Sequence, residues 1–396
     1  MFANGLPYLA IPGPSVMPDR VLRAMQRPAP NIYTGALHEM THSLIPDLRA
    51  VAGTSGHAAI YIANGHGTWE AALANVVAEG DRVLVLATGV FCKGWGEMAK
   101  GLGVAVDLLD FGDSAAVDPA RIEDALRADG AGRIRAVLMV LVDTSTGVLN
   151  DVGAVRAAMD AAGHDALLMV DAIASLGCDR YEMDASGADV TIAASQKGLM
   201  TPPGLGFVWF NDRADAQRGS LARVSRYWDW RPRVDPDEYW KYFDGTAPTH
   251  HLFALREALD MIDEEGLPAI WARHDGLARA IWAACDVWGE GGPLRLNVPD
   301  PAARSRAITS IGLEPGQGDA LRGWVERTAG VTLGIGLGRD PASAFVRIGH
   351  MGHVNAHMVL GVLASIEAGL AALDIPHGPG GTAAASAVLA DLARPV

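Results

Sequence analysis

Between about residue 59 and residue 210, short runs of β-branched and apolar residues alternate with longer stretches of helical period. Strands that alternate with helices are typical of a mostly parallel sheet covered on both faces by helices. The predicted fold class is therefore α/β. We expect strands at Ala59–Asn64, Arg82–Ala87, Val104–Leu109, Arg135–Val142, Ala166–Val170 and Val190–Ala193, and another at Gly206–Phe210 after a Pro-Pro-Gly turn.

On either side of this region the pattern changes. Ile11–Pro18 has three prolines in eight residues, which predicts an extended arm laid over other structure rather than an interior strand. Two long helical patterns, Thr249–Glu264 and Pro268–Trp288, are followed by shorter alternating elements that predict a smaller α/β domain. The glycine-rich and proline-rich segment Pro376–Thr382 predicts a flexible linker before a last helix. The expected parts are an arm (1–20), a large domain (21–265) and a small domain (266–396).

Composition narrows the classes of function. A chain of 396 residues, 49% of them hydrophobic, can bury a large core. Its formal charge is −14 and it has no basic run, which disfavours nucleic acids and anionic membranes as partners. The three cysteines are far apart and lack metal-ligand spacing, so neither a metal site nor a disulfide framework is expected. Without a leader-like start or an apolar run long enough to cross a bilayer, the protein is expected to be cytoplasmic.

One lysine and one aspartate are the strongest candidates for chemistry. Lys197, one of only four lysines, follows an apolar strand, and its amine can form a Schiff base where a guanidinium cannot. Asp171 follows another apolar strand, and ligands of open parallel sheets collect at such carboxyl ends. Pyridoxal 5'-phosphate (PLP) requires this pair, an acid for its ring nitrogen and an amine for its aldehyde. Alternatively, Lys197 is a surface lysine that lies along apolar neighbours.

Four other stretches carry candidate site residues. Asn64–Gly67 joins a strand end to a helix through a glycine-rich turn that suits a phosphate, although many such turns contain glycine. Phe91 opens the next helix, where it could stack on a flat ring or belong to the core. Ser145 could hold a cofactor oxygen or cap a turn. Arg347, among apolar residues, favours a carboxylate or phosphate partner, from a substrate or from the protein.

Taken together, these stretches resemble the class V, fold-type-I PLP-dependent aminotransferases, in the branch of alanine–glyoxylate and serine–glyoxylate aminotransferases. The resemblance runs from Ile11 to about Gly352, in matching order and spacing. It rests on Pro-Gly-Pro-Ser at 12–15, Gly65-His66-Gly67 with Glu70, Gly89-Val90-Phe91, Ser145-Thr146-Gly147-Val148, Val170-Asp171, Ser195-Gln196-Lys197 with Pro202-Pro203-Gly204, Thr246-Ala247-Pro248 and Arg347-Ile348-Gly349.

The resemblance implies a large PLP-binding domain with a mostly parallel sheet between helices, and a smaller C-terminal α/β domain. It implies that Lys197 forms the Schiff base and that Asp171 pairs with the pyridine nitrogen. Phe91 would stack on the ring and Ser145 would lie beside it. Arg347 would bind the substrate carboxylate. The phosphate would be surrounded by Asn64, Gly65, His66 and Gln196, and by Thr246 of a neighbouring subunit in a homodimer with shared active sites.

The implied reaction is transfer of the amino group of a small L-amino acid, serine or alanine, to glyoxylate or a similar 2-oxo acid. This sequence departs from the family pattern at Phe243, where relatives can place a phosphate-binding tyrosine. The loop Tyr33–His38 also lacks the Asp-His-Arg string of serine–glyoxylate members.

Four alternatives remain from the sequence, one of which is a non-catalytic binding protein that would not need Lys197. Gly89–Gly96 and Arg347–Gly352 also resemble pyridoxamine–pyruvate aminotransferase, which uses free pyridoxamine as its substrate. A cysteine desulfurase would need a mobile nucleophilic cysteine towards the C-terminal domain, whereas the last one, Cys285, lies in a helical pattern. Gly334–Gly338 is the only hint of a nicotinamide-binding dehydrogenase, and a strand rather than a helix is expected after it.

Overall fold

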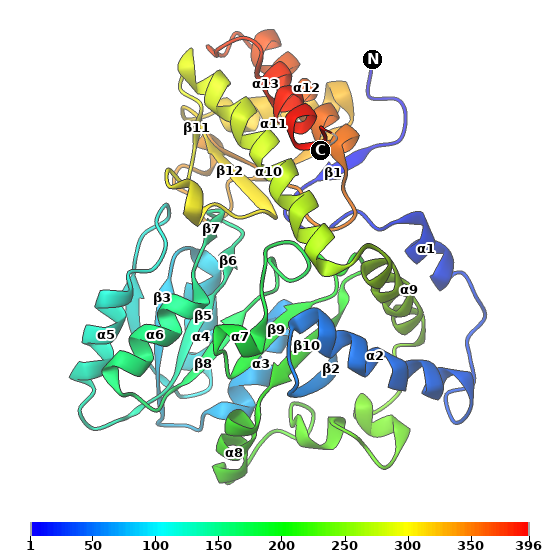
Figure 1. Cartoon of the computed structure of the whole chain (residues 1–396), viewed down its shortest axis with the longest axis vertical. Coiled ribbons are helices and arrows are strands. Elements are labelled where there is room, and N and C mark those ends of the chain that lie inside the picture. The colour runs from blue at the N-terminus through cyan, green and yellow to red at the C-terminus, as the bar shows by residue number, and fades with distance from the viewer. Residues whose placement is uncertain (1, 395–396) are drawn as a thin grey trace.

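The computed structural model describes residues 2–394, and it contains a large and a small β-sheet that lie one above the other in Figure 1. In the large sheet β10 is antiparallel to both of its neighbours, and the other neighbouring pairs are parallel. The predicted mostly parallel sheet is therefore confirmed. Its strands, in spatial order, are β2 (His57–Ala63), β10 (Gly204–Phe210), β9 (Val190–Ala194), β8 (Leu167–Asp171), β5 (Ile134–Val140), β3 (Arg82–Ala87) and β4 (Ala105–Asp110).

Helices cover both faces of this sheet, which explains why its strands are apolar almost throughout. In β3, Leu84 and Leu86 belong to the core on one face, and Val83 and Val85 to the core on the other. The first face is covered mainly by α2 (Ala36–Ala52), α5 (Pro119–Ala128), α6 (Val152–Ala162) and α9 (Thr249–Glu265), with α1 (Asp19–Met25) and α7 (Met183–Ser186). The second is covered by α3 (Gly65–Val76), α4 (Val90–Gly101) and α8 (Asp212–Ser220).

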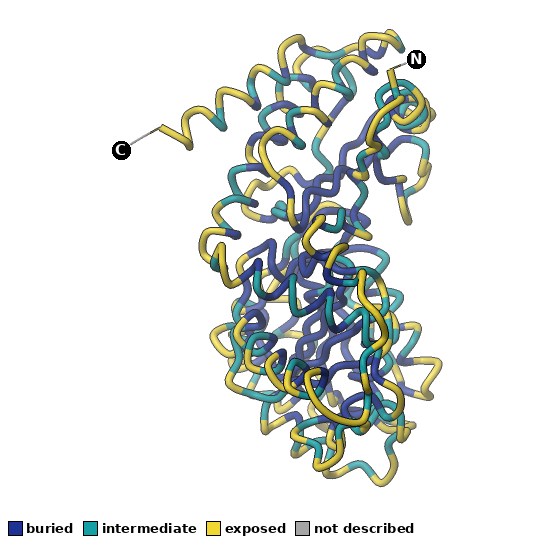
Figure 2. Tube along the Cα trace, turned by 90° about the vertical axis from the view of Figure 1, so that its right-hand side faces the viewer, coloured by how far each residue is buried: buried dark blue, intermediate teal, exposed yellow. Residues whose placement is uncertain are grey.

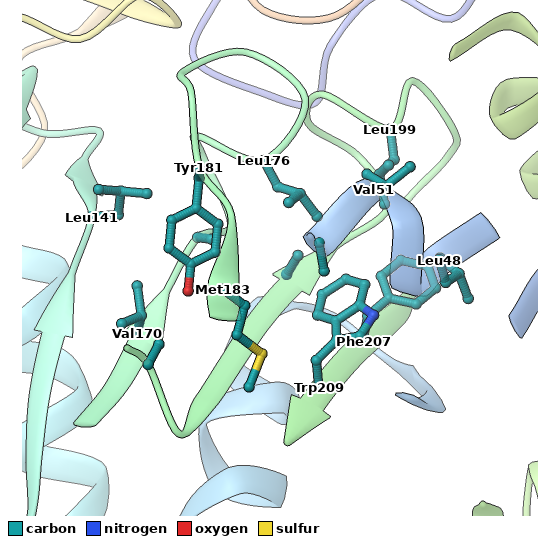
Figure 3. Close-up of a cluster of buried hydrophobic side chains, with 14 of the residues drawn as sticks. Leu48, Val51, Leu141, Val170, Leu176, Tyr181, Met183, Leu199, Phe207 and Trp209 are labelled. Carbon is teal, nitrogen blue, oxygen red and sulfur yellow. The ribbon is translucent and has the colours of Figure 1, made fainter. Parts of the chain in front are cut away.

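Figure 3 shows part of the core on the first face. Phe207 and Trp209 of β10 point toward α2, where Leu48 and Val51 meet them. These four side chains are at most 5% exposed. Burying an apolar side chain of this size stabilises the fold by about 1.5–3 kcal/mol.

The small sheet has its own core. Its strands, in spatial order, are β1 (Tyr8–Ala10), β13 (Val331–Ile335), β14 (Phe345–Gly349), β12 (Ile308–Gly312) and β11 (Arg295–Leu296). The helices packed on it are α10 (Leu267–Glu290), α11 (Gln317–Ala329), α12 (Ala356–Ala372) and α13 (Gly381–Leu392). The short elements elsewhere are β6 (Val142–Asp143), β7 (Val148–Leu149) and the 3₁₀ turns η1 (Arg231–Arg233), η2 (Tyr239–Tyr242), η3 (Pro301–Ala303) and η4 (Ala342–Ala344).

The arm contributes a strand that the sequence pattern did not predict. Tyr8 pairs with Val331 at the start of a parallel ladder between β1 and β13. Ile11–Pro18 then runs on from the small sheet as an irregular segment. At the other predicted division, Gly266 separates α9 from α10. The division into an arm and two domains stays a prediction.

The segment Pro376–Thr382 is packed, so the prediction of a flexible linker is wrong. The Glu367 carboxylate accepts hydrogen bonds from the backbone N–H groups of Gly380 and Thr382, both at 2.9 Å. A Cβ atom on Gly378 would lie 2.0 Å from a backbone oxygen of α10. Glycine is therefore present here because the segment touches α10 closely, and not because the segment is mobile.

Buried residues run through the centre of both parts of the molecule, and exposed residues lie on the outer helices and loops (Figure 2). Among residues 2–394, no helix has the length and apolar character needed to cross a bilayer.

Candidate active site

A cavity of about 180 Å³ opens beyond the carboxyl ends of the parallel strands. Asp171 is the last residue of β8, and Lys197 lies in the turn after β9. Parallel strands present their carboxyl ends at one edge of the sheet, which brings these distant residues together. Of the predicted site residues, the cavity is lined by Asn64, Gly65, His66, Phe91, Asp171, Gln196 and Lys197.

Asp171 is an acid in an apolar setting. Its side chain is only 3% exposed, and burial raises its pKa to about 7. Its Oδ1 accepts the N–H of Ile173 at 2.7 Å, and its Oδ2 accepts the indole N–H of Trp69 at 2.7 Å. A cation beside Asp171 would lower this pKa again, because an opposite charge favours the ionised carboxylate.

Lys197 is partly buried, and its amine donates a hydrogen bond to the carbonyl oxygen of Pro12 in the arm. Burial, followed by the positive charge of Arg347, lowers the pKa of Lys197 to about 8. The arm also holds the lysine's backbone, since Ser15 Oγ donates to the Lys197 carbonyl at 2.7 Å. An amine with this pKa is partly neutral near pH 8, as a nucleophile or a base must be.

At another part of the cavity, the first turn of α3 presents its N-terminus. The side chain of Asn64 caps this helix and accepts the N–H of Gly67 at 3.2 Å. The first N–H groups of a helix have no acceptor within the helix and attract anions. Gln196 lines the same cavity, and its Oε1 is buried with no hydrogen-bond partner among the described residues.

Aromatic rings form part of the cavity wall. His66 and Trp69 meet edge to face with ring centroids 4.5 Å apart, and Phe91 lies 6.3 Å from Trp69. Partial burial lowers the pKa of His66, which favours its neutral form. A flat ligand in this cavity would contact apolar surface from these rings.

Ser145 is brought close to the cavity without lining it. Its hydroxyl donates to Asp143 Oδ1 at 2.5 Å, and its neighbour Thr144 lines the cavity instead. Asp143 also accepts the N–H of Phe91 at 2.9 Å, and burial raises the pKa of Asp143. Ser145 thus helps to hold the start of α4 in place, and a direct contact with a cofactor stays a prediction.

Arg347 reaches the edge of the site from β14 of the small sheet. Its Nη1 donates to the carbonyl of Thr144 at 2.6 Å, and its Nε donates to the carbonyl of Ile335 at 2.5 Å. Burial lowers the pKa of Arg347 to about 10. Within residues 2–394, no carboxylate forms an ion pair with this guanidinium, so one of its edges is available to an outside carboxylate.

Thr246 lies apart from the cavity. It is exposed and lines a second, surface pocket together with Tyr33 and Tyr239. Phe243 is fully buried against aromatic neighbours, so its position offers no hydroxyl group to any ligand. A role for Thr246 in the chain's own cavity is not supported, which leaves the predicted role in a neighbouring subunit.

Sequence reasoning missed Trp69 and Pro12 as neighbours of the site. Trp69 belongs to the stretch Gly65–Glu70, which carries part of the family resemblance, but helix periodicity alone assigns this residue to the core. The contact of Pro12 with Lys197 spans 185 residues, and no local signal predicts it.

The residues present fit PLP. Asp171 and Lys197 line one cavity, where they could meet a protonated ring nitrogen and an aldehyde. The N-terminus of α3 offers backbone N–H groups to a phosphate, and the side-chain amide of Gln196, which lines the same cavity, has an NH₂ group that could donate as well. When bound, the cofactor would supply an electron-accepting ring, which the protein itself lacks.

The rival classes fit the structure less well. Cys285 is 1% exposed inside α10, and burial raises the pKa of its thiol, so it is a poor nucleophile. Gly334–Gly338 runs from β13 into a turn, and η4 and β14 follow where a dinucleotide-binding motif would need a helix.

Comparison with known proteins gives the family. The aminotransferase class-V family model matches residues 7–351. The chain is 38% identical to a serine–glyoxylate aminotransferase of Methylorubrum extorquens, over 97% of this chain and 96% of the relative. It is 32% identical to an L-aspartate–glyoxylate aminotransferase of Paracoccus denitrificans, over 92% and 91%.

A solved structure of pyridoxamine–pyruvate aminotransferase from Mesorhizobium loti superimposes with a TM-score of 0.87 at 27% identity, covering 98% of both chains. The predicted fold type I is thereby confirmed. The match of family model and full-length relatives, on a chain whose cavity joins Asp171 to Lys197, shows that this protein belongs to the class-V family of PLP-dependent aminotransferases.

Proposed function

We propose that the protein transfers the amino group of a small L-amino acid, serine or alanine, to glyoxylate or a similar 2-oxo acid. The observation that carries the proposal is Arg347, a buried arginine at the edge of the cavity whose hydrogen bonds go to backbone carbonyls only. The serine–glyoxylate relative, 38% identical over 97% of this chain, supports the same substrate class.

Arg347 is expected to bind the α-carboxylate that donor and acceptor share. Its Nε–H is already used by Ile335, which blocks the side of the guanidinium formed by Nε and Nη2. Nη1 uses one of its two N–H groups for Thr144, so its other N–H and one N–H of Nη2 are left to receive the carboxylate in a forked contact. This orientation fixes the α-carbon of the substrate relative to the lysine.

Lys197 moves the proton in this proposal. With the cofactor bound, the Lys197 amine would act as the base that removes the proton from the α-carbon of the substrate and then as the acid that returns a proton, while the cofactor would supply the electron-accepting ring. A pKa near 8 suits both steps, because the amine can accept and donate a proton near the working pH. Asp171 would keep the ring nitrogen of the bound cofactor protonated, because a carboxylate beside that nitrogen favours its charged form.

The preference for a donor with an uncharged side chain follows from the residues around the cavity. Arg347 lies at the edge of the cavity, and none of the residues that line it is a second arginine, so a side-chain carboxylate would find no partner comparable to Arg347. A buried carboxylate without a partner is unfavourable. Aspartate and glutamate are therefore expected to be poorer donors than serine or alanine.

A panel of substrates tests the proposal with the purified holoenzyme. Serine, alanine, aspartate and free pyridoxamine are each assayed with glyoxylate and with pyruvate, and kcat/KM is compared. We expect serine or alanine with glyoxylate to be fastest. Faster turnover of aspartate, the donor named for one relative, would overturn the assignment of the donor but not of the reaction class.

Pyridoxamine–pyruvate transfer is the second candidate. It is favoured by the TM-score of 0.87 with a solved enzyme of that name. The N-terminus of α3 argues against it, because its N–H groups form a site suited to the phosphate that free pyridoxamine lacks. Faster turnover of pyridoxamine with pyruvate than of any amino acid with glyoxylate would establish this candidate instead.

We further propose that the working unit is a homodimer with shared active sites. Thr246 is exposed outside the chain's own cavity, in a surface pocket that also presents Tyr33, which is 81% exposed. An exposed aromatic beside a polar ligand candidate is typical of an interface. Two-fold pairs are also the commonest closed assemblies.

A further inference from the structure

Trp69 makes a contact with the acid of the site that the sequence did not predict. Its indole Nε1–H donates to Asp171 Oδ2 at 2.7 Å, across 102 residues of sequence. The ring is 2% exposed and stacks on Trp95 with centroids 6.2 Å apart and planes at 14°. A donor held so rigidly loses little side-chain entropy on binding its acceptor.

The other carboxylate oxygen is held by the backbone. Ile173 donates its N–H to Oδ1 at 2.7 Å, two residues beyond Asp171 itself. Each oxygen therefore has one donor, and together the two donors fix the plane of the carboxylate at the cavity wall. Since an indole has a donor and no acceptor, Trp69 can bond the ionised form and gains nothing from a protonated oxygen in that position.

We propose that Trp69 is a positioning residue that fixes the carboxylate of Asp171 and keeps it ionised at the cavity wall. The inference rests on the role proposed above for Asp171. Without the indole N–H, the buried acid would more readily take up a proton, and a protonated acid cannot balance a positive charge on the ring nitrogen of the cofactor.

The charges around Asp171 make this contribution necessary. Burial raises the pKa of Asp171, and the nearby Asp143 raises it further, while the N–H groups of Ile173 and Trp69 and the charge of Lys197 lower it. The thiol of Cys92 is also close, but burial raises its pKa and it stays neutral. Trp69 is thus one of only a few groups that oppose protonation of this acid.

The first experiment uses the cofactor-free protein and reads Asp171 directly. Difference infrared spectroscopy follows the carbonyl stretch of protonated carboxyl groups against pH, and the band lost in Asp171→Asn is assigned to Asp171. Trp69→Phe keeps a buried ring but removes the N–H donor. Losing a hydrogen bond to a charged group should raise the midpoint of Asp171 in this variant by about one pH unit or more.

Trp209→Phe is the matched control. Trp209 is equally buried, and its indole N–H has no hydrogen-bond partner among the described residues. Its replacement should leave the midpoint within a few tenths of a unit of the wild type. An unchanged midpoint in Trp69→Phe, or an equal rise in Trp209→Phe, would overturn the proposal.

A second measurement needs no change at Trp69. In protein labelled with ¹⁵N-tryptophan, one indole N–H resonance should move with a midpoint near pH 7, as the pKa of Asp171 requires, and should be insensitive to pH in this range in Asp171→Asn. A wild-type spectrum in which no indole resonance shows this difference would contradict the proposal. Both readouts are independent of turnover, so a failure of the proposed substrates would leave them intact.

Discussion

The two residues at the centre of the site are both held away from their ordinary ionisation behaviour. Burial raises the pKa of Asp171 to about 7 and lowers the pKa of Lys197 to about 8. In each case burial disfavours the charged form, because charge is poorly solvated away from water. Burying these two groups lowers the free energy of unfolding, and this effect can be measured.

Replacing Asp171 by Asn should stabilise the cofactor-free protein at high pH. When the pKa of a carboxyl group is higher in the folded protein than in the unfolded chain, the folded protein loses stability as the pH rises between the two pKa values, here from about 4 to about 7. Above pH 7 the variant should be more stable by about 1–3 kcal/mol, and the difference should fade towards pH 4. Urea unfolding at several pH values measures this; a difference that is independent of pH would contradict it.

Lys197 gives a kinetic prediction. Because its pKa lies near 8, the rate at which the cofactor-free protein captures PLP should rise about tenfold per pH unit at first and level off near pH 8. Stopped-flow absorbance of PLP capture follows the rate. A rise that continues to pH 10 would indicate an ordinary lysine instead.

Arg347 gives a prediction on binding. Arg347→Lys should raise KM for donor and acceptor together, by about tenfold or more, because a point charge cannot make the forked contact. Arg339→Lys is the control, since Arg339 bonds Asn297 and pairs with Asp113 rather than facing the cavity. Steady-state kinetics with donor and acceptor varied in turn measure both KM values. A change in kcat alone would show that Arg347 does not bind the substrate carboxylate.

Local sequence pattern was sufficient to bring Asp171 and Lys197 to one cavity, because Asp171 ends β8, Lys197 follows the end of β9, and such strand ends meet at one edge of a parallel sheet. It was insufficient for Trp69, whose helix position indicates only burial. The direction of its indole depends on packing against Trp95, which belongs to another helix. Sequence periodicity records which face of an element is buried, and not what a side chain meets there.

At the scale of elements, the alternation of strands and helices predicted the large sheet, whose strands have long apolar patterns. It missed β1, because three residues before a proline-rich segment are too few to show a period. The strand is specified by its partner β13 instead. The packed segment Pro376–Thr382 was missed for a similar reason, since composition does not distinguish glycine needed for close contact from glycine in a mobile loop.

The arm provides the prediction at this scale. Gly13 has a φ of +92°, and a Cβ atom there would lie 2.4 Å from Lys197 Nζ. Gly13→Ala should therefore slow PLP capture by about tenfold or more, in addition to a backbone strain of roughly 1–3 kcal/mol. Gly35→Ala is the matched control, because Gly35 has a φ of +90° with no atom within 4 Å of the added Cβ.

Thermal unfolding and the rate of PLP capture separate the two effects. Both variants should lose stability, and only Gly13→Ala should capture the cofactor slowly. Equal capture rates in the two variants would mean that the arm does not control the position of Lys197.

At the scale of the whole molecule, the proposed dimer can be tested by mixing subunits. Lys197→Ala removes the amine from a chain's own site, and Thr246→Ala removes a contact proposed to serve the partner. In a mixed dimer one site lacks both groups and the other has both, so refolding an equal mixture should restore about a quarter of the sites.

Tight PLP binding measured by titration counts the restored sites, and sedimentation reports the assembly. Refolded Thr246→Ala alone provides the baseline. No gain in tight sites upon mixing, or an active monomer, would refute the shared site.

The hydrogen bonds that join Pro12 and Ser15 of the arm to Lys197 have a consequence for the synthesis of this protein. Tyr8–Ser15 leaves the ribosome 182 to 185 residues ahead of the lysine turn that it holds, and β13, which anchors β1, is synthesised later still. The large sheet can form while synthesis continues, since all its strands precede residue 211. A nascent chain stalled before residue 331 therefore has Lys197 but not the strand that anchors the arm, and one of the earliest segments to be translated becomes one of the last to be fixed in place.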